Sequence, residues 1–359
     1  MDGKRPPVWN PSIAPMVFAG DVSFATGGIP IKPLEAVVQD HQTRAARAAE
    51  GDPRPLALVE GPAAGRAPAA SASQRLRTLV RACRPRQWSK NLLVLAAPCA
   101  AGVIDQAGVA VEVLGAFVVL CLISSATYLV NDVRDREQDR MHPRKRLRPI
   151  AAGELAPASA LRVAAVLALG GIALGVVIQP GLGVLAVGYL ALTASYSLWL
   201  RRIVVLDILA IAAGFVLRAL AGGVATDIYL SRWFVLVTAF GAIYLVAAKR
   251  LAELRDHGGE EPLRATLMQY SVGSLRLTVA TSATLASIAY ISWAFTRPSH
   301  AVLYVLSIVP FVGWLGRYAA LIGTGAGQAP EELILRDRTL LALSVAWGLL
   351  FIGGVYVGR

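Results

Sequence analysis

Residues 115–139 read GAFVVLCLISSATYLVNDVRDREQD, an apolar run that ends in a cluster of aspartates and arginines. No charged residue occurs from 115 to 130, and the apolar character extends back to residue 109 with a single glutamate. About 20 such residues are enough to cross the hydrocarbon core of a bilayer as an α-helix. The sequence therefore predicts a transmembrane helix near 109–130 that brings its charged end to the membrane surface.

The composition of the whole chain agrees with a membrane protein. Of its 359 residues 55% are hydrophobic and the mean hydropathy is +0.56, yet the formal net charge is +12. Ordinary soluble domains do not combine these properties, because their apolar side chains are limited to one core. We therefore expect an all-α, polytopic membrane protein.

Apolar windows similar to the first recur between charged breaks from about residue 90 onward. Each is near the length of a bilayer-spanning helix. We predict a bundle of about nine transmembrane helices, near 91–104, 109–130, 157–178, 182–200, 203–224, 232–249, 275–295, 300–318 and 339–357.

The segment before these spans differs in composition. Residues 1–70 are rich in Ala, Pro, Gly and charged residues and contain only short apolar stretches. Such a segment cannot bury enough apolar surface to fold alone. We expect 1–70 to be a mostly disordered cytoplasmic extension and 75–359 to be the transmembrane domain.

The distribution of Lys and Arg predicts the orientation of the chain in a cell (inner) membrane. Basic residues collect in cytoplasmic loops. With a cytoplasmic N-terminus, the loops that carry most of the basic residues of the membrane domain all lie inside, at 131–156, 201–202, 249–274 and 319–338.

Three aspartates follow the helix predicted near 109–130. If this helix continues past the membrane surface, Asp132, Asp135 and Asp139 lie at i, i+3 and i+7 and share one face. Carboxylate oxygens suit Mg²⁺, which binds through a few carboxylates, waters and substrate phosphate oxygens. With the basic residues that surround them, they predict a diphosphate site. The basic cluster alone is equally well read as a solvated anchor at the membrane surface.

The stretch NDVRDREQD, 131–139, resembles the NDxxDxxxD signature of the UbiA superfamily of intramembrane prenyltransferases. The sequence RPIAAG that follows is similar to the RPxxxG continuation of that signature. The resemblance covers about 75–359 and implies a UbiA-like fold in which the three aspartates hold Mg²⁺ against a diphosphate. Three further stretches resemble one branch, the decaprenyl-phosphate phosphoribosyltransferases of actinobacterial cell-wall synthesis: RPRQWSKN at 84–91, YSLWLRR at 196–202 and PEELILRDR at 330–338.

One departure from the superfamily pattern favours that branch. Where a second aspartate motif is usual, this chain has Lys249 and Arg250, and only Glu253 and Asp256 remain as carboxylates. A Lys–Arg pair cannot bind Mg²⁺ but can hold phosphate. The branch implies phosphoribosyl diphosphate as donor and a polyprenyl phosphate in the membrane as acceptor, with transfer of the phosphoribosyl group for arabinogalactan synthesis.

Other polar residues are candidate substrate ligands beside these motifs. Tyr196 could donate a hydrogen bond to the substrate, although an interfacial tyrosine is the simpler account. Asp207 and Arg218, inside the fifth span, should face the interior and lie too far apart to pair. The remaining candidates are Arg84, Lys90, Asn91, Asn131, Arg140 and Arg148, for the first three of which headgroup anchoring is an equal alternative.

Two other functions stay open from the sequence. A conventional UbiA enzyme would move a prenyl chain to an aromatic or lipid acceptor, and a transporter would use acidic residues along an ion path. Transporter sites usually lie at mid-membrane, whereas these aspartates follow a helix end. We expect no nucleic-acid partner, and homo-oligomerisation is left open.

Overall fold

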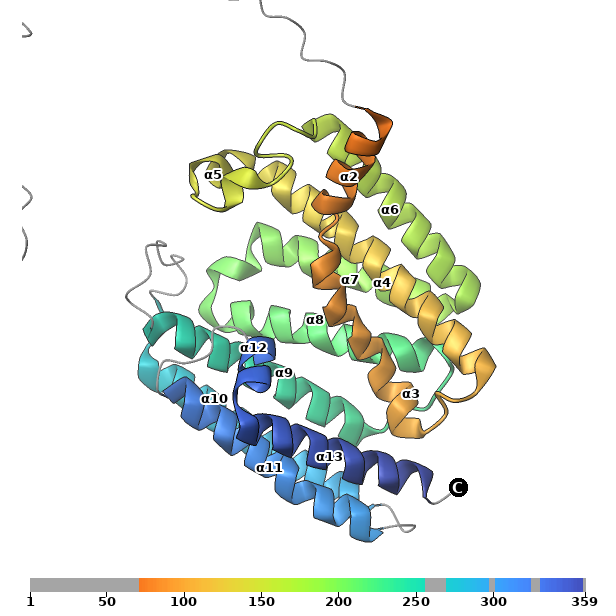
Figure 1. Cartoon of the computed structure of the whole chain (residues 1–359), viewed down its shortest axis with the longest axis vertical. Helices are drawn as coiled ribbons and strands as arrows, with labels where there is room; N and C mark the ends of the chain where they lie inside the picture. Colours follow the sequence, from red (N-terminus) through yellow and green to blue (C-terminus); the bar gives the residue numbers. More distant parts are fainter. Residues whose placement is uncertain (1–70, 256–268, 297–300, 324–329, 358–359) are drawn as a thin grey trace, which may run out of the picture. The chain divides into compact units, whose positions relative to one another are not determined.

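The computed structural model describes residues 71–255, 269–296, 301–323 and 330–357 (Figure 1). Within these ranges all regular structure is helical, which confirms the predicted fold class. The extension predicted for 1–70 and the candidate ligand Asp256 lie outside the described residues.

Eight helices in the described ranges are long and apolar enough to cross a membrane. They confirm eight of the nine predicted spans and differ from them by six residues at most. They are α4 (Ala107–Arg134), α6 (Pro157–Ile178), α7 (Pro180–Leu198), α8 (Val204–Ala225), α9 (Arg232–Arg255), α10 (Val272–Phe295), α11 (Ala301–Gly323) and α13 (Arg338–Tyr356).

The span predicted at 91–104 is helical but is not one long α-helix. It consists of a 3-10 helix, η1 (Pro85–Leu95), and a short α-helix, α3 (Ala96–Ala101). Pro98 has no N–H to donate to the preceding turn, and Gly102 ends α3 in the left-handed conformation with φ 72°. The structure therefore has eight long spans in its described part, where the sequence predicts nine.

Short helices connect the long ones. Helix α2 (Ala72–Ala82) precedes η1, and Ser71 caps it by accepting a hydrogen bond from the backbone N–H of Gln74 at 3.2 Å. The remaining short helices are α5 (Arg136–Met141), η2 (Lys145–Leu147), η3 (Leu200–Arg202) and α12 (Pro330–Arg336).

Helix α8 lies at the centre of the helical part and joins two apolar cores. Its Ile208 packs in a core with α9, α10 and α11, whereas its Ala221 packs in another with η1, α4 and α7. Figure 1 shows α8 across the middle of the view, with α4 and α6 above it and α10, α11 and α13 below. Polar residues of α8 therefore lie between the two cores.

The backbone of η1 approaches α8 closely because a glycine faces it. A Cβ placed on Gly222 would come within 1.8 Å of the carbonyl oxygen of Val94. No other residue type fits there without moving the backbone. This contact holds η1, with its candidate ligands, against the central helix.

Candidate active site

Two of the three predicted aspartates converge where α4 ends. Helix α4 stops at Arg134, and Asp135, with φ −89° and ψ 9°, separates it from α5. Because of this break, the expectation of three carboxylates on one continuous helix is not met. Asp132 and Asp139 are both buried and form ion pairs with the same residue, Arg148. Asp135 is half-buried and pairs with Arg201.

Arg148 and Arg84 neutralise the two buried carboxylates. Arg148 Nη1 lies 2.6 Å from Asp139 Oδ2 and 3.3 Å from Asp132 Oδ1. Arg84 forms a second ion pair with Asp132 and stacks over the ring of Tyr128, 5.1 Å from its centroid. The sequence named both arginines as candidates, and the structure brings them together with Asp132.

The backbone at Arg84 has an unusual conformation. This residue joins α2 to η1 with φ 55° and ψ 61°, the left-handed region that a non-glycine residue rarely adopts. Such conformations concentrate at functional sites, where surrounding contacts hold them. Here the conformation turns the chain between the two helices and the side chain bonds Asp132.

The other predicted residues of this stretch have separate partners. Asp135 Oδ2 lies 3.4 Å from Arg201 Nη1, and Asn131 Oδ1 accepts a hydrogen bond from Ser197 Oγ at 2.8 Å. Arg140 donates to the carbonyl oxygen of Ala151 at 3.1 Å. The first two contacts join the end of α4 to the end of α7 and to η3, and the third joins α5 to the segment before α6.

Glu137 belongs to the same acidic stretch but not to the cluster. Its exposed carboxylate accepts hydrogen bonds from Arg136 and Arg140. The hydrogen bond from Arg136 lowers the pKa of Glu137 below its usual range. Glu137 is therefore an exposed carboxylate that stays ionised, whereas the buried carboxylates of the cluster are paired with Arg84 and Arg148.

A second charged cluster joins α8 to α9. Arg250 donates from Nε to Asp207 Oδ2 at 2.9 Å and from Nη2 to Asp207 Oδ1 at 3.1 Å, and its Nη1 bonds Glu253 at 2.8 Å. Tyr196 donates to Asp207 Oδ1 at 2.9 Å. The two-pronged pair is buried on both sides, and the 43 positions that separate its members gave no sequence signal for it.

Tyr270 lies next to this cluster, just before α10. Burial raises its pKa to about 12, and the negative charge of Asp207 adds to the effect. Its hydroxyl donates to the carbonyl oxygen of Val204 at the start of α8. The phenol is therefore neutral at physiological pH and acts as a hydrogen-bond donor.

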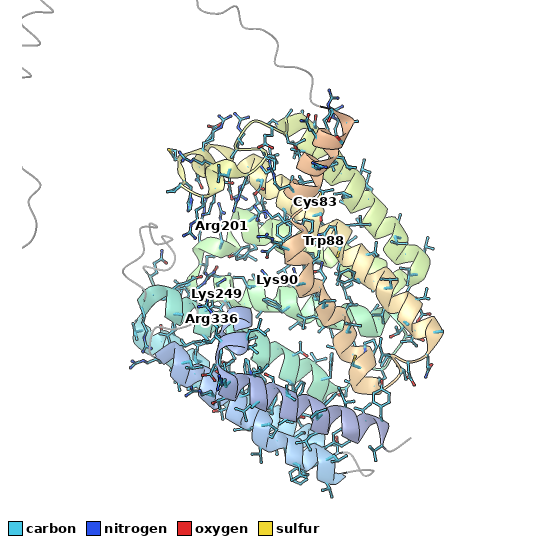
Figure 2. All side chains as sticks on the ribbon, viewed as in Figure 1. Cys83, Trp88, Lys90, Arg201, Lys249 and Arg336 are labelled. Carbon is cyan, nitrogen blue, oxygen red and sulfur yellow. The ribbon has the colours of Figure 1, made fainter. Side chains whose placement is uncertain are left out.

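Lys249 differs from its neighbour Arg250. Its side chain is exposed, and no described residue forms a hydrogen bond or an ion pair with it. Figure 2 shows basic side chains around the middle of the view, with Lys90 on η1, Lys249 on α9, Arg336 on α12 and Arg201 after α7. Of the predicted Lys–Arg pair, the lysine is thus available to an anion and the arginine is bonded to two carboxylates.

A third cationic side chain, Arg218, is buried at mid-helix in α8. It donates to Asn91 Oδ1 at 3.0 Å, to the carbonyl oxygen of Gly214 at 2.8 Å and to the hydroxyl of Tyr189. Its guanidinium also lies over the rings of Tyr189 and Phe215. No described carboxylate pairs with it, and it does not contact Asp207, as the sequence predicted.

The carboxylates at the end of α4 have the donor chemistry of a magnesium site. Among the described residues no group of three or more His, Cys, Asp or Glu side chains is arranged to hold a metal. Mg²⁺ needs fewer, because it binds through one or two carboxylates and completes its shell with waters and substrate phosphates. The oxygens of Asp132 and Asp139, which meet at Arg148, fit that requirement.

Comparison with known proteins gives consistent matches. The model of the UbiA prenyltransferase family matches residues 92–343. A decaprenyl-phosphate phosphoribosyltransferase from Mycolicibacterium smegmatis is 43% identical over 285 residues, which cover 75% of this chain and 89% of the relative. One from Corynebacterium glutamicum is 42% identical over 290 residues, covering 78% and 87%.

A solved structure has the same fold at low sequence identity. It is a UbiA homolog from Archaeoglobus fulgidus bound to GPP and Mg²⁺, with a TM-score of 0.59 and 15% identity. The match covers 78% of this chain and 98% of the homolog. At that identity the likeness concerns the arrangement of helices.

Proposed function

The chain belongs to the UbiA prenyltransferase family of membrane transferases, and we propose that it moves a 5-phosphoribosyl group from phosphoribosyl diphosphate to a polyprenyl phosphate. The main support is its identity of 42–44% over three quarters of the chain to relatives named decaprenyl-phosphate phosphoribosyltransferase. The product is polyprenyl-phosphoribose, which we place in the synthesis of cell-wall arabinan.

The leaving diphosphate binds at the end of α4. Asp132 and Asp139 would hold Mg²⁺, which when bound would supply positive charge to the diphosphate, and Asp135, at the break between α4 and α5, is the third candidate ligand. Arg84 and Arg148 already lie on these carboxylates and can bond phosphate oxygens as two-pronged donors. Arg140 and Asn131 support this wall of the site.

The 5-phosphate of the ribose needs cationic side chains that lie apart from the proposed metal site. Lys249, which is exposed, is the first candidate, with Lys90 as the second. Arg250 positions this end of α9 through Asp207 and Glu253, and it becomes a direct phosphate ligand only if that ion pair opens. We assign Asn91 and Tyr196 to positioning, because they bond Arg218 and Asp207.

The reaction then needs no general base from the protein. The bond between C1 of ribose and the diphosphate oxygen breaks, and an oxygen of the lipid phosphate forms the new bond to C1 as diphosphate leaves. The acceptor phosphate is already an anion at neutral pH, so no proton has to be removed from it. The side chains contribute positive charge where negative charge develops on the leaving group.

The test is transfer by the purified protein. We would incubate it in detergent with Mg²⁺, phosphoribosyl diphosphate labelled in the ribose and decaprenyl phosphate, and extract the lipid. Label in the lipid fraction that disappears with EDTA supports the proposal. Label in the lipid at an unchanged rate with EDTA contradicts the metal assignment.

A parallel reaction tests the alternative. It contains a prenyl diphosphate and an aromatic acid in place of the two proposed substrates. Product in this reaction, with none from phosphoribosyl diphosphate, would identify a conventional prenyltransferase and refute the proposal.

A further inference from the structure

A hollow of about 340 Å³ opens between α9, α10 and α11, on residues that the proposed reaction does not use. Its walls are mainly apolar, and two arginines line it. Leu251 and Arg255 of α9, Arg276 of α10 and Gly316 of α11 are among the residues that line it.

Small residues create this hollow. Ala280 and Ala283 of α10 face Gly316 and Ala319 of α11 across it. A Cβ added to Gly316 would meet no atom within 4 Å, so the space beside this glycine is open. The hollow can therefore receive an alkyl chain, and a side chain at position 316 would begin in this open space.

The charge at the hollow is positive. Arg255 donates from Nη1 to the carbonyl oxygens of Ile322 at 3.2 Å and Gly323 at 2.7 Å, and so caps the end of α11. The other N–H groups of its guanidinium can donate to an anion. Arg276 is exposed in the second turn of α10. In the described part of the chain, neither arginine pairs with a carboxylate.

The hollow and the candidate active site lie at the same side of the membrane. Successive spans alternate in direction, so the last turns of α4, α9 and α11 and the first turn of α10 share one side. The two sites are on different faces of α9, because Arg250 bonds Asp207 of α8 whereas Leu251 and Arg255 line the hollow. An occupant of the hollow would therefore contact α9 on a face that does not carry Arg250.

We propose that this hollow binds an anionic phospholipid of the surrounding bilayer. One acyl chain lies against the small residues, and the phosphate lies between Arg255 and Arg276. Basic pockets between transmembrane helices bind acidic lipid headgroups. Here the apolar wall matches the acyl chain and the two arginines match the charge of the phosphate. The bound lipid joins α9 to α10 and α11, and so stabilises the helix that carries Lys249 and Arg250.

The test compares phosphatidylglycerol with phosphatidylcholine. The full chain, purified in a neutral detergent, is titrated with each lipid while its thermal unfolding temperature is followed. We expect phosphatidylglycerol to raise this temperature with a saturable midpoint, and phosphatidylcholine to raise it less. Arg276→Gln should move the phosphatidylglycerol midpoint about tenfold higher, the effect of losing one charge-assisted contact.

Matched variants separate the hollow from the rest of the surface. Arg162→Gln removes an exposed arginine in the first turns of α6, on the same side of the membrane, and should leave the midpoint unchanged. Gly316→Phe should abolish the response to phosphatidylglycerol. Gly348→Phe, at a glycine of α13 that also faces open space, should retain it.

Four results would overturn the proposal. One is an equal midpoint for Arg276→Gln and Arg162→Gln, and another is an equal response to the two lipids. The third is a change of oligomeric state in Gly316→Phe with an unaltered lipid response, which would assign the hollow to contact between copies of the chain. A response to decaprenyl phosphate but not to phosphatidylglycerol would likewise replace the phospholipid with the acceptor.

Discussion

At the scale of single residues, the site depends on which carboxylate meets which arginine. Sequence motifs named Asp132, Asp139, Arg84 and Arg148 as candidates, and the structure joins all four. The pairing itself was not predictable, because Arg84 lies 48 positions from Asp132, in the link between α2 and η1. For Arg250 the expectation and the structure differ. Its residue type suggested a ligand for phosphate, whereas in the structure it forms an ion pair with Asp207.

The first prediction concerns the buried carboxylates. Asp132→Asn should remove nearly all transfer activity, because it deletes one charge from the pair that shares Arg148 without changing the size of the side chain. Transfer of ribose label to decaprenyl phosphate is the measurement. The matched control is Glu137→Gln, which removes an exposed carboxylate from the same stretch and should retain wild-type activity.

Equal activity losses in these two variants would show that the whole acidic stretch acts through its net charge. The variant Asp135→Asn tests the third carboxylate of the motif. We expect this variant to lower activity strongly as well. The carboxylate of Asp135 is the third ligand of the proposed metal site, although it pairs with Arg201 in the structure.

A second prediction concerns the ion pair between α8 and α9. Arg250→Ala should destabilise the protein by about 3–5 kcal/mol, because it leaves the buried carboxylate of Asp207 without its cation. Arg250→Lys keeps the charge but not the fork, and should recover only part of the loss. Thermal unfolding in detergent measures both variants.

Donor-saturation kinetics then separates positioning from direct contact. Lys249→Ala should raise the KM for phosphoribosyl diphosphate with little change in unfolding temperature, because Lys249 is exposed and bonds no described residue. A wild-type KM in Lys249→Ala would remove this lysine from the phosphate site.

At the scale of helices, hydrophobic runs predicted most of the fold and failed where the backbone departs from a regular helix. The ends of α6 coincide with the prediction at 157–178 because Pro157 begins that run and Pro180 follows it. The segment at 91–104 is apolar like the others, but it forms η1 and the short helix α3, which contains Pro98 and ends before Gly102. The helix break at Asp135 was not predictable either, because no proline or glycine marks it.

The third prediction concerns the start of α13. Asp337 accepts a hydrogen bond from the backbone N–H of Leu340 at 2.8 Å and pairs with Arg317 at 2.7 Å. The hydrogen bond from Arg317, followed by the one from Leu340, lowers the pKa of Asp337 in the folded protein. A carboxylate with a lowered pKa stabilises the fold above its unfolded pKa of about 4, and this contribution is lost as the pH falls through the folded value.

The variant Asp337→Asn isolates the charge, because asparagine remains a good N-cap. Its unfolding temperature should lie below that of the wild type at pH 7, and the difference should shrink as the pH falls below about 4. Arg317→Gln is the matched control and should reproduce the difference at pH 7. A difference that does not change with pH would show that the cap geometry, and not the ion pair, is responsible.

At the scale of the whole molecule, α8 organises the helical part of the chain that the structure describes. It contributes to both large cores, faces η1 through Gly222, and carries Asp207 and Arg218 toward different neighbours. The number and length of spans followed from hydropathy, but hydropathy could not show which helix is central. Helix α8 is distinguished by its many small residues and its two charges, features whose partners lie elsewhere in the chain.

The fourth prediction is the orientation of the spans. In a variant whose three cysteines are replaced by serine, Lys145→Cys should react with a membrane-impermeant thiol reagent only from the cytoplasmic side. Tyr229→Cys, an exposed residue between α8 and α9, should react only from outside. The reverse pattern would place the aspartate cluster away from its cytoplasmic donor.

The buried, acid-free environment of Arg218 has a consequence for how the chain enters the membrane. An arginine at the centre of a helix costs about 2.5–3.5 kcal/mol on translocon insertion scales. Two partners of Arg218, Asn91 and Tyr189, leave the ribosome before α8, whereas the ion-pair partner of Asp207, Arg250, follows 43 residues later. Helix α8 alone should therefore insert poorly.

We expect Arg218→Leu to restore insertion of the isolated helix in a glycosylation-mapping assay, and the segment from residue 71 through α8 to insert without any substitution. Equal insertion of the isolated helix with and without the arginine would disprove this dependence. Since Arg218 is satisfied by residues already synthesised, the nascent chain can supply from its own earlier segments the polar surroundings that lipid does not offer. The order of synthesis thereby becomes the order of assembly, with η1, α4 and α7 present at the translocon before α8 arrives.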